Sequence, residues 1–325
     1  MNFMSSLDPH QHTIKKPVSM RGIGLHSGRA VNLTIKPAEV DTGIRFVRSD
    51  VAAPAIPASM RLVVDTRLAT TIARDETAVA TTEHLLAALS GMNIDNALIE
   101  LDGPEVPIMD GSAGPFVHLL RKADRRRQKG VRRVLRITDE IAVRDGGKEI
   151  RVLPGDGLKI TCEIDFDHEL IRRQRFSIEL SPRKFAAEIA MARTFGFMED
   201  VEKLQENGFA LGGSLENAVV MDQGGVLNPE GLRFRDEFVR HKILDIVGDL
   251  ALLGCPVLGH VIASRSGHRQ HLLLMQEIAR RPECWELVEL ESRGATRRGQ
   301  EAASPASLLM PILAPSSLAG DSCPA

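Results

Sequence analysis

The sequence E-F-V-R-H-K-I-L-D-I-V-G-D-L-A-L-L-G, Glu237–Gly254, decides the fold because it combines an apolar face with a polar stripe at helical spacing. The apolar residues recur mainly at intervals of three and four, which predicts an amphipathic helix. They are Phe238, Ile243, Leu244, Val247, Leu250 and Leu253. Asp236 and Glu237 suit the positive end of the helix dipole, and Gly254 followed by Pro256 predicts where the helix ends.

The polar stripe of this helix consists of His241, Asp245 and Asp249, which are spaced by four residues and therefore lie along one side. An imidazole and a carboxylate four residues apart can bind one metal ion. The alternative is a solvated His–Asp pair on an ordinary surface helix. A metal site needs a third ligand from elsewhere in the chain.

Length and composition describe an ordinary globular protein. A chain of 325 residues favours two domains, and 43% hydrophobic with 26% charged residues is typical of soluble proteins. A net charge of -2 gives no electrostatic case for binding nucleic acid or an anionic membrane surface. No apolar run is long enough to span a bilayer, and the N-terminus lacks the plan of a signal peptide. The four cysteines include no C-x-x-C pair, so we expect neither a thiolate zinc site nor a disulfide framework. We therefore expect a cytoplasmic location.

The order of predicted elements indicates the fold class. In the first half, alternation and turn residues predict strands at Thr13–Met20, Ala30–Lys36, Gly43–Arg48, Arg61–Val64 and Ala97–Leu101. Helices are predicted at Thr81–Leu89 and Gly114–Ala123. The second half has the same plan, with strands at Val134–Thr138, Glu149–Leu153, Leu158–Ile164, Phe176–Leu180, Asn217–Met221 and Val261–Ser264, and helices at Pro182–Ala192, Glu199–Glu206 and His271–Arg280 besides the helix quoted above. Strands followed by helices, twice, predict an α+β protein of two layered domains.

The strongly basic run Arg121–Arg133 allows two interpretations. It could bind nucleic acid, but it has no interleaved aromatic residues, which favours a solvated helix end and an interdomain linker. We therefore expect an N-terminal domain over residues 1–126, a basic linker over 127–133 and a C-terminal domain over 134–293. The composition after Gly294 predicts a disordered tail over 294–325.

Glu83 and His84 stand at the start of a predicted helix, with Thr81 as the expected N-cap. Alone, they could serve only capping or packing. Together with His241 and Asp245, however, His84 completes a set of three protein ligands with one open position, which describes a catalytic zinc site. Glu83 would then be the base that takes a proton from the attacking water.

A third candidate is the sequence R-S-G-H, Arg265 to His268, where a predicted strand ends in a glycine turn. A histidine in a loop is usually a surface residue. Gly267 could instead direct His268 into a cleft as a proton donor, and Asp249 nearby would favour its protonated form.

Several motifs together resemble those of a known family. They are T-T-E-H-L-L-A-A-L from Thr81, V-P-I-M-D-G-S-A from Val106, A-R-T-F-G-F from Ala192, L-G-G-S from Leu211, V-R-H-K-I-L-D-I-V-G-D-L from Val239 and S-G-H from Ser266. The set resembles UDP-3-O-acyl-N-acetylglucosamine deacetylase, the zinc amidase that commits the lipid A pathway of Gram-negative bacteria. The likeness runs from about residue 12 to residue 290.

The resemblance implies a two-domain α+β fold in which the helices are sandwiched between two sheets. It implies Zn²⁺ bound by His84, His241 and Asp245, with Glu83 as the general base. The histidine matching His268 would be the general acid or a cationic stabiliser. The residue matching Asp249 would support it.

The resemblance also implies how substrate is bound. Thr194 matches a threonine that donates a hydrogen bond to the developing oxyanion, and Lys242 matches a lysine that contacts the substrate. Phe195 and the segment Gly196–Gly213 match a hydrophobic passage for the acyl chain. Arg265 stands where many members have lysine, so the positive charge for a contact with the nucleotide phosphates is retained, while the geometry of that contact need not be the same.

The implied reaction is hydrolysis of the acetamide of UDP-3-O-(3-hydroxyacyl)-N-acetylglucosamine to the free amine and acetate. The ligand set also suits Fe²⁺. We expect a monomer, with an acylated substrate that permits transient contact with a membrane surface. Two alternatives are a nucleotide-sugar or acyl-chain binding protein without catalysis, and a different metal hydrolase. The joint presence of the ligands with Glu83, His268 and Thr194 favours the enzyme.

Overall fold

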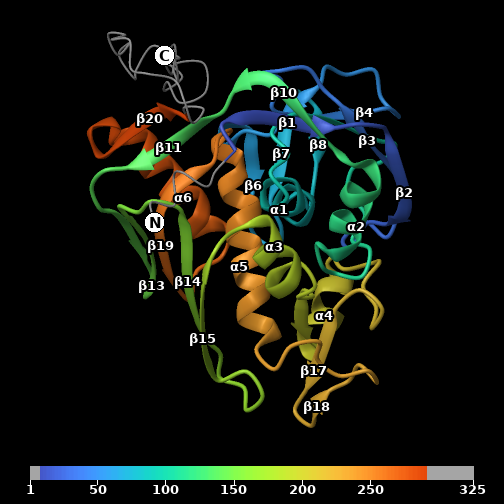
Figure 1. Cartoon of the computed structure of the whole chain (residues 1–325). Helices are drawn as coiled ribbons and strands as arrows, with labels where there is room; N and C mark the ends of the chain where they lie inside the picture. The colour runs from blue at the N-terminus through green and yellow to red at the C-terminus, as the bar shows by residue number, and fades with distance from the viewer. Residues whose placement is uncertain (1–7, 291–325) are drawn as a thin grey trace, which may run out of the picture.

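The computed structural model describes residues 8–290, and in it two sheets enclose a layer of helices (Figure 1). The first half contains a five-stranded sheet in the order β2 (Val18–Ile23), β3 (Ala30–Pro37), β9 (Ala97–Leu101), β4 (Ile44–Arg48) and β5 (Ile56–Pro57). Its strand pairs are antiparallel except β4 with β9. The helices of this half are α1 (Glu83–Gly91) and α2 (Gly114–Ala123).

The second half is built around β19 (Val257–Ser264), which pairs with three strands in a seven-stranded sheet. The other strands are β11 (Arg133–Ile137), β12 (Ile141–Asp145), β13 (Lys148–Leu153), β14 (Leu158–Asp165), β15 (Arg173–Glu179) and β20 (Trp285–Glu289). The helices α5 (Glu237–Leu250) and α6 (His268–Arg280) belong to this half. The expected α+β class, with helices between sheets, is confirmed.

Smaller elements complete the described chain. A three-stranded sheet joins β6 (Val63–Asp65), β7 (Thr71–Arg74) and β8 (Thr77–Val79), and another joins β16 (Phe195–Phe197), β17 (Val219–Asp222) and β18 (Gly225–Val226) beside α4 (Met198–Glu206). The expected helix over Pro182–Ala192 is instead a short α3 (Pro182–Lys184) followed by a π-helical turn, Phe185–Ile189. The predicted tail, residues 294–325, lies outside the described residues.

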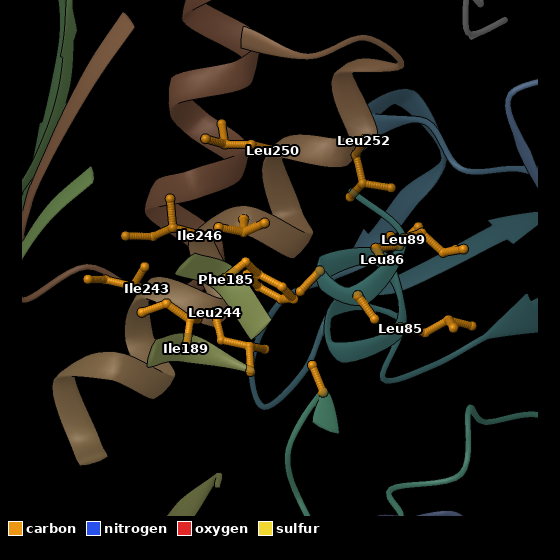
Figure 2. Packing of buried hydrophobic residues seen from close by; sticks show 14 of the residues in the cluster. Leu85, Leu86, Leu89, Phe185, Ile189, Ile243, Leu244, Ile246, Leu250 and Leu252 are labelled. Carbon is orange, nitrogen blue, oxygen red and sulfur yellow. The ribbon is translucent and has the colours of Figure 1, made fainter. Parts of the chain in front are cut away.

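The apolar face of α5 forms the centre of the core, as its spacing predicts. All six of its predicted apolar residues are buried, and Figure 2 shows Phe185 between α5 and the leucines of α1. After Leu250 the helix tightens into a 3-10 turn, Ala251–Leu253, and it stops at Gly254 in the left-handed conformation (φ 80°). The glycine is required there because other residues adopt this conformation at a cost.

The basic run differs from the prediction. Arg121 lies in the last turn of α2, but Arg125–Val131 forms the strand β10, which pairs antiparallel with β1 (His10–Ile14). The helix-end interpretation is therefore wrong for this part. Its arginines are exposed as expected, while the backbone finds hydrogen bonds on β1, a partner more than a hundred residues away in the sequence.

Gly248 sets how closely α5 approaches the N-terminal end of α1. A Cβ atom built at Gly248 would lie 2.1 Å from the carbonyl oxygen of Glu83, a backbone atom that cannot rotate away. The absence of a side chain at this position therefore fixes the distance between Glu83 on α1 and the polar stripe on α5.

We expect Gly248→Ala to lower stability by about 1–3 kcal/mol, the usual cost of forcing an extra group into a packed core, and to lower activity because it displaces Glu83. Thermal unfolding measures the first effect, and the rate of the hydrolysis expected from the sequence measures the second. The matched control for stability is Gly196→Ala, whose added Cβ would have no neighbour closer than 4.0 Å. Equal melting temperatures for the two variants would contradict this account of the helix contact.

Candidate metal centre and active site

Three potential metal ligands meet where α1 crosses α5. His84 comes from the first turn of α1, and His241 and Asp245 lie one turn apart on α5. Nε2 of His84 lies 3.8 Å, and Nε2 of His241 lies 3.3 Å, from the same oxygen, Oδ1 of Asp245. All three side chains are buried. The polar stripe predicted on α5 is therefore an interior feature and not a solvated face.

The chemistry of this cluster fits a divalent metal ion. Nδ1 of His241 lies 3.0 Å from the carbonyl oxygen of Ala192, so it carries the proton and donates it, and Nε2 presents its lone pair to Asp245. Burial lowers the pKa of His84 to about 3 and also lowers the pKa of His241, so both imidazoles are neutral. Oδ1 of Asp245 is buried and has no hydrogen-bond partner within residues 8–290. An unpartnered buried carboxylate oxygen is costly, and a cation between it and the two nitrogens removes that cost.

The second carboxylate oxygen of Asp245, Oδ2, accepts a hydrogen bond from Lys242. Its Nζ donates to Oδ2 at 2.9 Å and lies 5.5 Å from the centre of the Phe195 ring. Burial opposes the charges of both partners, but their attraction holds the pKa of Lys242 above, and that of Asp245 far below, the ordinary values. Lys242 thereby orients the carboxylate and leaves Oδ1 for the metal.

Glu83 lies beside the ligand cluster, and one of its carboxylate oxygens already accepts a hydrogen bond. Oε2 accepts a hydrogen bond from the backbone nitrogen of Thr70 at 3.0 Å, while Oε1 lies 3.9 Å from Nε2 of His268. Burial raises the pKa of Glu83 to about 7, although the positive charge of His268 works in the opposite direction. A carboxylate that exchanges its proton near neutral pH is suited to general base catalysis.

Asp249 holds His268 in place. Its Oδ2 accepts hydrogen bonds from Nδ1 of His268 and Nδ1 of His271, each at 2.7 Å, and its Oδ1 accepts one from the hydroxyl of Thr70 at 2.6 Å. Burial opposes the charge of His268, but Asp249 outweighs it and raises the pKa of His268 to about 10. His268 is therefore a cation that directs its Nε2 proton toward Glu83.

The position of His268 differs from the prediction in one respect. It does not lie in a glycine turn but begins α6, which starts three residues earlier than expected. Gly267 is the N-cap, and its backbone nitrogen donates to Oε1 of Gln270. Similarly, α1 begins at Glu83 with Thr82 as its N-cap, because Thr81 has φ 55° and donates its hydroxyl proton to Glu105.

Sequence reasoning missed the residues that hold this arrangement. Thr70 and His271 bind Asp249, and His271 also contacts Ser266 at 3.0 Å. For His271, the three-residue spacing from His268 was an available signal, since it places both rings on one side of α6. No local sequence pattern indicates that Thr70 binds Asp249.

A buried ion pair, also missed, fixes the segment that carries Thr194. The guanidinium and backbone nitrogens of Arg193 both donate to Oε1 of Glu237, at 2.9 and 3.0 Å. Glu237 was expected to complement the helix dipole, but it is fully buried in this pair. The pair sets Ala192 against His241, while Thr194 donates its backbone proton to the carbonyl oxygen of Gly111 at 2.8 Å.

The expected acyl-passage segment borders the cluster. Phe195 packs edge-on against Phe166 and Phe238, with ring centres 5.7 and 4.9 Å apart. In this segment Met198 and Leu211 are large apolar side chains that are 40% and 54% exposed.

Arg265 lies apart from the ligand cluster. It donates to Asp165 at 2.6 Å and lines a hollow of ≈ 630 Å³ together with Arg172 and Arg173. Asp165, Asp167 and Glu169 also line this hollow, so its cations are accompanied by as many acids.

A buried group of three potential metal ligands beside a carboxylate and a fixed imidazolium, set among helices between two sheets, is the arrangement expected of a metal-dependent hydrolase. A family profile described as UDP-3-O-acyl N-acetylglycosamine deacetylase matches residues 11–280. The chain therefore belongs to this deacetylase family.

Three individual relatives support the same family assignment. The chain is 51% identical over 291 residues to the UDP-3-O-acyl-N-acetylglucosamine deacetylase of Myxococcus xanthus, covering 88% of this chain and 93% of that protein. The proteins of the same name from Anaeromyxobacter sp. and Syntrophotalea carbinolica are 50% and 49% identical, over 87% and 96% of this chain and 93% and 98% of their own lengths. Among the described residues, no helix combines the length and the apolar character needed to cross a membrane.

Proposed function

We propose that this protein hydrolyses the acetamide of UDP-3-O-(3-hydroxyacyl)-N-acetylglucosamine, giving UDP-3-O-(3-hydroxyacyl)-glucosamine and acetate, the committed step of lipid A biosynthesis. The main support for this proposal is that Oε1 of Glu83 lies 3.9 Å from Nε2 of His268, beside the three potential metal ligands. The substrate is proposed from the names of the relatives.

We further propose that His84, His241 and Asp245 hold Zn²⁺, although the same donor set suits Fe²⁺. When bound, the ion would supply a Lewis acid for the acetamide carbonyl and would lower the pKa of water from 15.7 to about 7. The neutral imidazoles and the unpartnered Oδ1 of Asp245 support this assignment.

The catalytic proton transfers fall to Glu83 and His268. Thr70 occupies Oε2 of Glu83, so Oε1 takes the proton of the attacking water. His268 keeps its Nδ1 proton in the bond to Asp249 and has its Nε2 proton available for the leaving amine. A second role for Glu83, returning its proton to the amine, is consistent with its pKa of about 7. The hydroxyl of Thr194 would donate to the developing oxyanion.

The remaining residues are assigned to substrate binding. Lys242 lies over the Phe195 ring and would contact the sugar while orienting Asp245. Phe195 with the segment Gly196–Gly213 would receive the acyl chain. Arg265 would contact the nucleotide phosphates, in competition with Asp165.

The proposal extends to the organisation of the protein. We assign residues 1–126 and 134–293 to two domains joined at 127–133, which form one cytoplasmic monomer that contacts the membrane surface only transiently. The ligands support this division, because His84 comes from the first half, and His241 and Asp245 from the second.

The decisive experiment measures metal content and acetate release on one sample. We expect close to one zinc per chain, loss of activity with a chelator and recovery when zinc is restored, because the catalytic cluster needs the cation between its donors. Loading with Fe²⁺ tests the alternative metal. Bound metal without acetate release would contradict the deacetylase proposal and favour a binding protein or another amide substrate.

A further inference from the structure

A second cavity lies at the opposite ends of the two helices that form the active site. Its volume is ≈ 870 Å³, within the range of about 300–1,000 Å³ typical of small-ligand pockets. Leu86 and Leu89 of α1 and Val247 and Leu250 of α5 line it, each beyond the catalytic residues toward the C-terminal end of its helix. Figure 2 shows Leu86 and Leu89 on one side and Leu250 on the other.

The inner wall of this cavity is aliphatic. Leu86, Leu89, Val247, Leu250 and Leu258 lie at its floor but are at most 4% exposed, so a ligand would contact mainly the partly buried residues in front of them. Partly buried residues continue the apolar wall outward; they are Leu62, Leu158, Leu180 and Leu287. Such a wall matches a hydrocarbon chain, because burying apolar surface is the main source of affinity in a pocket of this kind.

The mouth of the cavity is basic. Five arginines line the cavity against three aspartates; they are Arg45, Arg61, Arg125, Arg132 and Arg133, with Asp8, Asp41 and Asp95. Three of these arginines belong to the basic run Arg121–Arg133, for which the proposed reaction has no use.

The ion pairs at the mouth leave positive charge available. Arg132 is paired with Asp95 at 2.8 Å and Arg133 with Asp41 at 3.6 Å. The side chains of Arg45 and Arg125 are exposed and make no ion pair with any residue from 8 to 290. An anion could meet both without breaking a direct ion pair, although the charge of Arg125 already acts on Asp8 and Nε of Arg45 donates to the carbonyl oxygen of Thr42.

We propose that this cavity binds a single-chain amphiphile with an anionic head group, such as a fatty acid. The chain would lie along the partly buried leucines Leu62, Leu158, Leu180 and Leu287, and the carboxylate would lie at the arginines, of which Arg45 and Arg125 make no ion pair within residues 8–290. The ligand needs both a hydrocarbon chain and an anionic head group, because the wall is apolar and the mouth is cationic.

This site is independent of the proposed acyl passage. None of the residues of Gly196–Gly213 lines the cavity, and neither do the catalytic residues Glu83, His84 or His268. The proposal therefore stands or falls separately from the deacetylase assignment.

The test is a calorimetric titration of the zinc-loaded full-length protein with dodecanoate below its micellar concentration. With Leu211→Glu blocking the proposed acyl passage, we expect saturable binding at one site, with affinity rising about two- to fourfold for each added methylene. Dodecanol and dodecyltrimethylammonium should bind at least tenfold more weakly. Equal binding of dodecanol would overturn the head-group assignment, and no binding of dodecanoate would overturn the proposal.

Variants locate the site. Arg45→Gln combined with Arg125→Gln should weaken dodecanoate binding at least tenfold, whereas Arg144→Gln, an arginine with a 78% exposed side chain outside the cavity, should not. Ala251→Phe, which fills the cavity from its wall, should abolish binding, and thermal unfolding checks that each variant is folded.

Leu211→Glu distinguishes the two apolar surfaces, because it places a charge in the proposed passage and leaves the cavity intact. Dodecanoate binding that survives Ala251→Phe but not Leu211→Glu would show that the fatty acid occupies the passage, and would overturn the proposal.

Discussion

His241→Ala is expected to yield a folded protein that retains no stoichiometric zinc and releases acetate only at background rate. The imidazole is the ligand with its geometry most tightly fixed, since Nδ1 is bound to the Ala192 carbonyl and Nε2 faces Asp245 at 3.3 Å. Losing a supporting hydrogen bond to a metal ligand typically costs 10–100-fold in metal affinity or activity, and losing the ligand itself costs more.

The measurement is metal analysis after desalting, together with acetate release. His118→Ala is the matched control, because His118 is exposed on α2 and should leave zinc content and rate unchanged. Full zinc occupancy in His241→Ala would remove His241 from the ligand set, and full activity would refute the placement of the active site.

The organising helix and the closeness of His241 and Asp245 on it could be predicted from the sequence because both are local patterns. The apolar spacing of α5 is read along the chain, and so is the four-residue interval between His241 and Asp245. His84 required a different source of information. Its own surroundings allowed capping or packing, and only the combination with α5 and the family resemblance indicated a ligand.

The parts that could not be predicted depend on contacts between distant residues. Thr70 and Asp249 are 179 residues apart, yet their hydrogen bond helps to fix the carboxylate that holds His268. Arg193 and Glu237 each have an ordinary local interpretation, and only the folded chain shows that they neutralise one another in the interior. The strand β10 shows the same limitation, because its arginine-rich sequence does not indicate that β1 supplies its hydrogen bonds.

These long-range contacts share one consequence for the site. Thr70 bridges the base and the acid, since its backbone nitrogen binds Glu83 and its hydroxyl binds Asp249. Because one residue holds both, the separation between Glu83 and His268 is set by the small β-sheet around β7 as well as by α1 and α6. Thr70 therefore fixes this pair by contacts that the proposed metal ligands do not make, and it should be possible to disable the pair without releasing the metal.

Glu83→Gln tests this independence directly. The amide oxygen can still accept the hydrogen bond from Thr70, so the fold and the zinc content should be unchanged. The amide cannot take a proton, so we expect kcat to fall by about 10²–10⁴-fold, the usual contribution of general base catalysis, with little change in KM. Metal analysis and steady-state kinetics on the same preparation measure both. Zinc loss in Glu83→Gln would make Glu83 a contributor to metal binding, while a rate within a few fold of the parent protein would transfer the role of base to another residue.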